Sequence, residues 1–169
     1  MKHLLSLITI AALLWVGVSC SISYSFTGAS IPVEAKTISI GYFSNQSLLV
    51  MPTLSQTFTD ALKDRFIQQT PLDLIPQNGD IAIEGVISDY SSRPTAIQGN
   101  DVAALNRLTI TVKVKCVNKY DDKQSFERSF SRFADYSSSQ NLTSVQDALI
   151  EEIVNALTED IFNNAVVNW

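Results

Sequence analysis

The most constraining feature of this chain is a long alternation of apolar and polar residues in its second half. In the sequence RLTITVKVKCVNKY, residues 107–120, apolar side chains occupy every second position from Leu108 to Cys116. A period of two places successive side chains on opposite faces of a β-strand. The segment therefore predicts a long strand with one covered face and one solvated face, so a second layer must cover it.

Three other segments show the same period. The turn Asp121-Asp122 leads into residues 124–136, which predict the hairpin partner of the long strand. Two earlier strands are expected in residues 36–44 and 80–90. Their covered faces are predicted to carry Ile38, Ile40 and Tyr42 in the first and Ile81, Ile83 and Ile87 in the second. Gly85, inside the second of these strands, predicts a bulge or a close backbone contact.

Two segments have the period of an amphipathic helix. The first is expected to start at Pro52 and to end before Pro71, and the second starts where Thr143 and Gln146 have capping-box spacing. The apolar stripe of the second helix comprises Val145, Leu149, Ile153, Ala156, Leu157, Ile161 and Ala165. The element order predicts an α+β fold, a two-layer sandwich with two helices packed on one face of a small, mostly antiparallel sheet.

The N-terminus reads as a secretory leader. A basic start at Lys2 precedes the mostly apolar run of residues 4–18, which is shorter than the roughly 20 residues a spanning helix needs. The run stops at Cys20, directly after small and β-branched residues. This pattern resembles a bacterial lipoprotein box, which implies acylation of Cys20 after cleavage of residues 1–19.

The leader also sets the expected domain organisation. Residues 1–19 are expected to be a lipoprotein signal peptide, residues 20–36 a lipid-anchored tether, and residues 37–169 a single domain. Two or more acyl chains on Cys20 would anchor the chain stably, because one chain alone binds a membrane only marginally. The alternative is an ordinary secreted protein cut within residues 19–25, with Cys20 incidental.

Composition excludes several function classes. The formal net charge is −5, which argues against nucleic acid as a partner. The one histidine, His3, lies in the leader, so His-dependent catalytic triads and the usual zinc sites are excluded. The glycines stand too far apart for a phosphate loop. We therefore expect no enzyme activity, no metal and no cofactor, and an inert core role for Cys116.

Basic residues nevertheless share one parity on the long strand. Arg107, Lys113, Lys115 and Lys119, called the basic strip below, all fall on the solvated side of the alternation. Cations of this kind suit the phosphates of a glycolipid. The bland interpretation is a solvated face whose lysines discourage edge pairing. Arg128 and Arg132 on the partner strand either reach the sheet margin or join the strip through a bulge.

A polar stretch without period lies before the long strand. Residues 91–106, which include Arg93, Gln98, Gly99 and Asn100, predict a long loop. Loops that project from a rigid scaffold commonly carry binding residues, so this loop is a candidate partner-contact segment. A surface loop without a binding role is the alternative.

Several segments in order support a family resemblance. After the lipoprotein cysteine come TISIGYFSNQS, PTLSQTFTDALKDRF, AIQGNDVAALNRLTITVKVK, SFSRFADY and EDIFNNAVVNW. Together they resemble the LptE family of lipopolysaccharide-assembly lipoproteins, in its Bacteroidetes branch. The resemblance implies two helices on a small sheet. It also implies a position inside an outer-membrane β-barrel, LptD, with lipopolysaccharide as the cargo and a lipid anchor on the periplasmic side of the outer membrane.

Two other functions remain as alternatives. One is a lipid-anchored periplasmic scaffold or binding module of a different envelope or secretion complex. The other is a small carboxylate-dependent hydrolase using Glu84 and Asp89 or Asp121 and Asp122. Neither acidic pair has the arrangement of a shared acid/base site, which disfavours the hydrolase.

Overall fold

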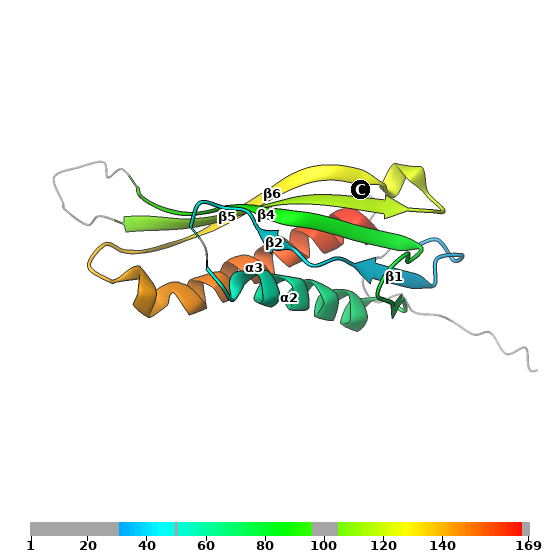
Figure 1. Ribbon diagram of the computed structural model, residues 1–169, viewed down its shortest axis with the longest axis horizontal. Helices are drawn as coiled ribbons and strands as arrows, with labels where there is room; N and C mark the ends of the chain where they lie inside the picture. Colours follow the sequence, from blue (N-terminus) through cyan, green and yellow to red (C-terminus); the bar gives the residue numbers. More distant parts are fainter. Residues whose placement is uncertain (1–30, 50, 96–104, 167–169) are drawn as a thin grey trace, which may run out of the picture.

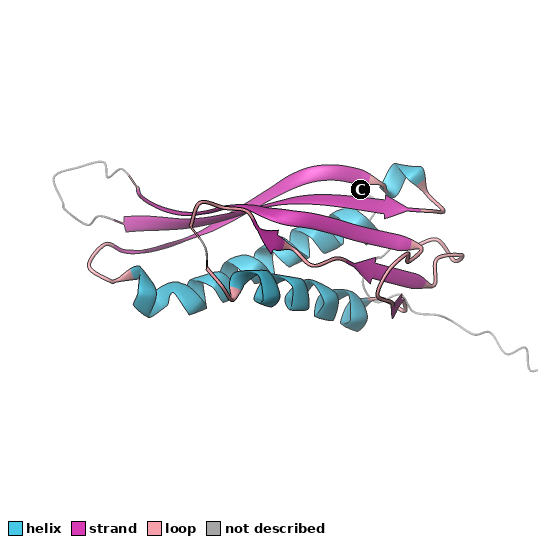
Figure 2. Ribbon diagram, viewed as in Figure 1, coloured by secondary structure: helices cyan, strands magenta, loops and turns pink. Residues whose placement is uncertain are grey.

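The computed structural model describes residues 31–49, 51–95 and 105–166, and it forms two layers (Figures 1 and 2). A six-stranded mixed sheet makes one layer, and helices α2 (Leu54–Gln69) and α3 (Leu142–Val166) pack on one face of it. The predicted α+β sandwich is therefore confirmed. None of the helices in these ranges is long and apolar enough to cross a membrane.

The sheet combines a short parallel part with a long antiparallel part. The strands are β1 (Thr37–Ile40), β2 (Ser44–Asn45), β3 (Asp73–Leu74), β4 (Ile81–Pro94), β5 (Leu105–Asn118) and β6 (Phe126–Ser137). Their order is β3-β1-β4-β5-β6, and β2 also pairs with β4. Pairings among β1, β2, β3 and β4 are parallel, whereas β4–β5 and β5–β6 are antiparallel. The antiparallel pairings are the longest, because the strands with the clearest alternation form them.

The core lies between the helices and the covered face of the sheet. It includes the predicted alternating residues of β5, from Leu108 to Cys116, all almost fully buried. Helix α3 buries a wider face than the predicted stripe, because it packs against both the sheet and α2. Phe43 meets Phe58 of α2 edge-on at a centroid distance of 4.9 Å.

Gly85 makes the Phe43 packing possible. A Cβ on Gly85 would lie 2.1 Å from the Lys113 carbonyl oxygen and 2.5 Å from the Phe43 ring. The expected close backbone contact is therefore present. The register shift in β4 lies instead between Ile87 and Asp89.

The first strand is shorter than expected, and one face assignment is wrong. β1 ends at Ile40, and Tyr42, expected on the covered face, is 59% exposed, whereas Phe43 is fully buried. The Gly41 amide still donates to the Ile83 carbonyl oxygen, as in a continued strand. Beyond Gly41 the alternation of covered and exposed side chains shifts by one residue, because Phe43 packs against Gly85.

Both helix starts also differ from expectation. α2 begins at Leu54 with Thr53 as its N-cap, because a turn from Met51 to Leu54 precedes the helix, so Pro52 lies outside it. For α3 the cap is not the predicted Thr143–Gln146 box. The cap is instead Asn141, two residues before Thr143, whose side chain accepts a hydrogen bond from the Thr143 amide at 3.1 Å.

The predicted loop at 91–106 is too long. β4 continues to Pro94 and β5 begins at Leu105, so Arg93 lies in a strand, opposite Arg107. The register shift after Ile87 explains the error. Because of the extra residue, the side chains of residues 89–94 no longer continue the alternation of residues 81–87, so the sequence shows no single period of two across both parts. Gln98, Gly99 and Asn100 lie outside the described residues, as does Cys20.

Candidate functional site

The face of the sheet that the helices leave uncovered, called the open face, carries most of the basic strip. Its central rows come from β4, β5 and β6, whose registers place Val86, Lys113 and Ser129 in one row. The next row joins Glu84, Lys115 and Glu127. The predicted common parity of Arg107, Lys113 and Lys115 on β5 is therefore confirmed.

The open face is balanced in charge and is not a bare cationic surface. Four bases and four acids alternate with hydroxyl side chains among its described residues: Arg93, Arg107, Lys113, Lys115, Glu84, Asp89, Glu127 and Asp135. The Thr111 and Ser131 hydroxyls bond across the strands at 2.9 Å. Such a face suits a polar ligand that offers both acceptors and donors.

Arg107 is already paired within the sheet. Its Nε and Nη2 donate to the Asp135 carboxylate at 2.7 and 2.9 Å, and its guanidinium carbon lies 3.6 Å from the centroid of the Phe133 ring. The hydrogen bond to Asp135 raises the pKa of Arg107, and Arg107 in turn lowers the pKa of Asp135. Sequence reasoning missed Asp135 and Phe133, although their parity on β6 could have indicated them.

Lys119 differs from the rest of the basic strip. It lies just beyond the end of β5, and its Nζ donates to the Asn78 carbonyl oxygen at 2.9 Å. Its charge also faces Asp80, whose pKa is lowered chiefly by the Lys36 amide and the Thr37 hydroxyl, with a small contribution from Lys119. Lys119 therefore supports the turn between β3 and β4.

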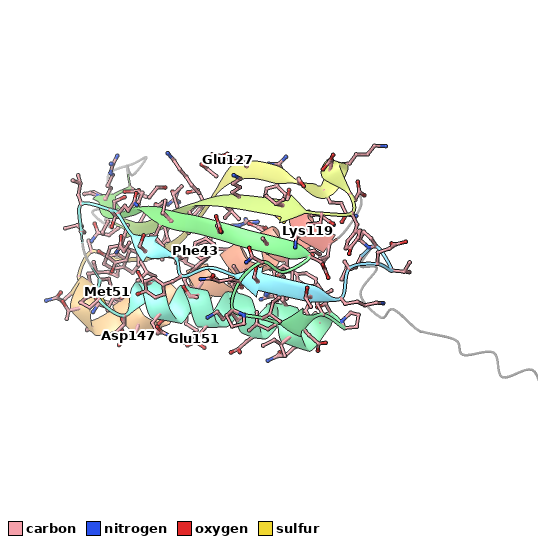
Figure 3. All side chains as sticks on the ribbon, turned by 45° about the vertical axis from the view of Figure 1, so that its right-hand side comes forward. Phe43, Met51, Lys119, Glu127, Asp147 and Glu151 are labelled. Atoms are coloured by element: carbon pink, nitrogen blue, oxygen red, sulfur yellow. The ribbon has the colours of Figure 1, made fainter. Side chains whose placement is uncertain are left out.

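Lys113 and Lys115 are the free cations of the strip. Within residues 31–49, 51–95 and 105–166, neither lysine forms an ion pair within 4.0 Å. They border a shallow hollow on the open face, together with Glu84, Val86 and Glu127. Lys115 lies between the two glutamates, whereas Lys113 faces Val86 and Ser129 and so has fewer acidic neighbours. Figure 3 shows Glu127 on the sheet layer, far from Asp147 and Glu151 on the helix layer.

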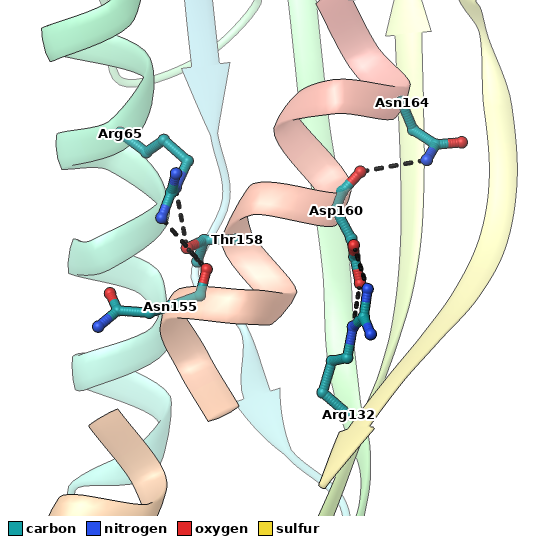
Figure 4. Close-up of polar contacts among 6 residues, drawn as sticks. All are labelled: Arg65, Arg132, Asn155, Thr158, Asp160 and Asn164. Atoms are coloured by element: carbon teal, nitrogen blue, oxygen red, sulfur yellow. Dashed lines mark hydrogen bonds and ion pairs between the residues drawn. The ribbon is translucent and has the colours of Figure 1, made fainter. Parts of the chain in front are cut away.

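Arg128 and Arg132 do not join the strip. Both reach from β6 to α3. Arg128 donates to the Asn164 side chain. Arg132 forms a two-point ion pair with Asp160 at 2.6 and 2.7 Å, as Figure 4 shows. The first of the two alternatives, the sheet margin, is therefore correct. These contacts fasten the edge strand to the helix layer.

Cys116, the cysteine that the structure describes, lies in the core. Burial raises the pKa of the Cys116 thiol to about 12, so it stays protonated in the core. The described part of the chain holds no group of three or more His, Cys, Asp or Glu side chains placed to bind a metal ion. The open face is thus a candidate binding surface.

Three comparisons place the chain among known proteins. The model of the family LptE, described as lipopolysaccharide-assembly, matches residues 35–165. No curated protein matches the sequence.

The solved structures that resemble it share the fold at low sequence identity. A minor lipoprotein of Acinetobacter baumannii is 16% identical with a TM-score of 0.50, covering 79% of this chain and 97% of that one. An uncharacterized lipoprotein B of Nitrosomonas europaea is 13% identical with a TM-score of 0.51, covering 80% and 83%. A hypothetical protein of Chlamydia trachomatis is 7% identical with a TM-score of 0.51, covering 78% and 98%.

Proposed function

The chain belongs to the LptE family of lipopolysaccharide-assembly proteins, and we propose that it works as an outer-membrane lipoprotein that plugs an LptD-like β-barrel. In this role it assists delivery of lipopolysaccharide to the outer leaflet. The family match over residues 35–165 carries the proposal, because it spans nearly all of the described residues.

Acylation of Cys20 is the proposed anchor, with residues 1–19 as the signal peptide and residues 20–36 as the tether. Figure 1 shows that β1 starts at one end of the long axis, whereas β4 ends and β5 begins at the opposite end. A tether that enters at β1 would hold that end at the periplasmic leaflet. The distal β4–β5 end, which includes Arg93, would then project into the barrel together with residues 98–100.

The open face is the proposed glycolipid contact. In the part of the chain that the structure describes, Lys113 and Lys115 have no acidic partner within ion-pair distance, so their ammonium groups remain available to phosphate. Arg107 is held by Asp135, and we assign it an orienting role beside Phe133. We assign Lys119 to the edge of this contact, because its ammonium group already donates a hydrogen bond to the Asn78 carbonyl oxygen.

Affinity purification from a detergent-solubilised envelope tests the function. We expect the full-length chain to recover an outer-membrane barrel protein in equal proportion, and its depletion to reduce surface lipopolysaccharide. A monomer recovered alone, with normal surface lipopolysaccharide after depletion, would contradict the proposal. Cys20→Ala should release the chain into the soluble periplasm, and continued membrane retention would contradict the anchor.

A further inference from the structure

A shallow groove runs between α2 and α3 on the outer side of the helix layer, called the helix groove below. Its floor is apolar, made by the half-buried Ala61 of α2 and the buried Ile150 and Val154 of α3. Thr57 stands exposed on one wall. Beyond the lining residues, Arg65 bridges the two helices by donating to the Thr158 hydroxyl and the Asn155 carbonyl oxygen at 3.1 Å each (Figure 4).

The other wall of the helix groove is acidic. Asp147 and Glu151 lie one turn apart on α3, both exposed, and Figure 3 shows them together on the helix layer. Among the described residues neither carboxylate has an ion-pair partner, and no lysine or arginine lines the groove.

All the charged side chains of α3 are negative. It carries five carboxylates and no basic residue, so its formal charge equals the net charge of −5 of the complete chain. The rest of the chain is therefore balanced. An anionic ligand would be repelled along this helix, whereas a cationic one would be attracted.

We infer that the helix groove docks a positively charged polypeptide segment of a partner protein, one that places an aliphatic side chain on the apolar floor and Lys or Arg beside Asp147 and Glu151. The charge of α3 selects this occupant over an anionic glycolipid. The apolar floor selects a peptide with aliphatic side chains over a simple cation. The inference rests on the proposed function only in naming the barrel as one source of the segment.

A defined peptide tests the inference without the natural partner. The probe is a fluorescein-labelled amphipathic peptide built from Leu and Lys, compared with its counterpart in which Glu replaces Lys, and binding is followed by fluorescence anisotropy. We expect the full chain to bind the Lys peptide at least tenfold more tightly. Equal binding of both peptides would overturn the inference.

Matched variants separate the groove from general charge attraction. Asp147→Asn with Glu151→Gln should weaken the Lys peptide at least fivefold. Glu152→Gln with Glu159→Gln makes the same charge change on the same helix outside the groove and should weaken it less than twofold. Equal loss of affinity in both double variants would show that α3 attracts the peptide only through its total negative charge, which contradicts the inference.

A third variant obstructs the helix groove from its wall without changing charge. Thr57→Trp adds a bulky ring to an exposed wall position and should also weaken the Lys peptide at least fivefold, with thermal unfolding unchanged. Unaltered binding would overturn the inference.

The natural partner is tested by co-purification. If wild-type chain recovers a barrel, the groove variant should recover less of it than the Glu152/Glu159 control does. Equal recovery would exclude the barrel as the occupant's source and leave the proposed function standing. If wild-type chain recovers no barrel, the proposed function fails, and the peptide measurements still decide the inference.

Discussion

The open face of the sheet and the outer side of the helix layer differ in how their charged side chains are distributed. On the open face, acids and bases alternate across three strands and cancel, and Arg107 and Asp135 even pair directly. On the helix layer, α2 is balanced, whereas α3 carries acids alone. The acidic character of the chain is therefore a property of one helix, and net charge by itself says little about which ligand either surface accepts.

The surfaces share one core, and damage to that core should abolish both. Phe58→Ala removes a fully buried ring that contacts Phe43, so we expect the free energy of unfolding to fall by about 3–5 kcal/mol. Urea unfolding measures it. Ile67→Ala on the same helix, at a position 51% exposed, is the control and should change stability by less than about 0.5 kcal/mol. Similar losses in both variants would show that α2 is not packed as described.

The open face should respond to its free lysines. Lys113→Glu with Lys115→Glu should weaken lipopolysaccharide binding by about tenfold or more, because charge-assisted hydrogen bonds to phosphate contribute roughly 1.5–3 kcal/mol each. Lys36→Glu with Lys123→Glu makes the same charge change at exposed positions away from this face. Binding that is unchanged, or weakened equally by both pairs, would mean that the basic strip is only a solvated face.

The stability of the sheet layer should depend on pH through Asp80. The Lys36 amide and the Thr37 hydroxyl lower the pKa of Asp80 below its ordinary value of 3.8. A lowered folded-state pKa gives stability that is present above the unfolded-state pKa and is lost as pH falls through the folded-state value. The stability difference between wild type and Asp80→Asn should therefore be present at pH 7 and shrink below about pH 4. A difference that stays constant over this range would contradict the assignment.

The smallest effect is expected at the shared core thiol. Because the pKa of Cys116 is raised to about 12, a thiol reagent at pH 8 should not modify Cys116 in the folded protein. In urea the thiol becomes exposed and should react fully. Rapid modification without denaturant would show that the sheet opens at β5.

Elements with one unbroken period could be predicted from the sequence. The alternation from Leu108 to Cys116 predicted β5 and its faces, and the same alternation placed Arg107, Lys113 and Lys115 together. In β4 the prediction failed after Tyr90, because one extra residue after Ile87 shifts the phase and residues 91–94 then read as a loop. Tyr42 and Phe43 exchanged faces for a related reason, since the chain turns at Gly41.

The contacts between elements could not be predicted. The sequence predicts the hairpin that brings β6 beside Arg107, but it does not give the register that places Asp135 opposite it. The pairing of Arg132 with Asp160 depends on which helix lies beside β6, and the sequence does not tell this. The helix groove was missed for the same reason. Its floor belongs to the apolar stripes of two helices, and only their packing leaves Ile150 and Val154 below a gap.

Photo-crosslinking tests whether the open face contacts the glycolipid while the helix groove contacts a protein segment. A photoreactive residue replaces Ser131 on the open face or Thr57 in the helix groove of the full-length protein in its own membrane. We expect glycolipid adducts from position 131 and adducts to a Lys- or Arg-bearing segment of a protein from position 57. Glycolipid adducts from position 57, or the same products from both positions, would contradict this expectation.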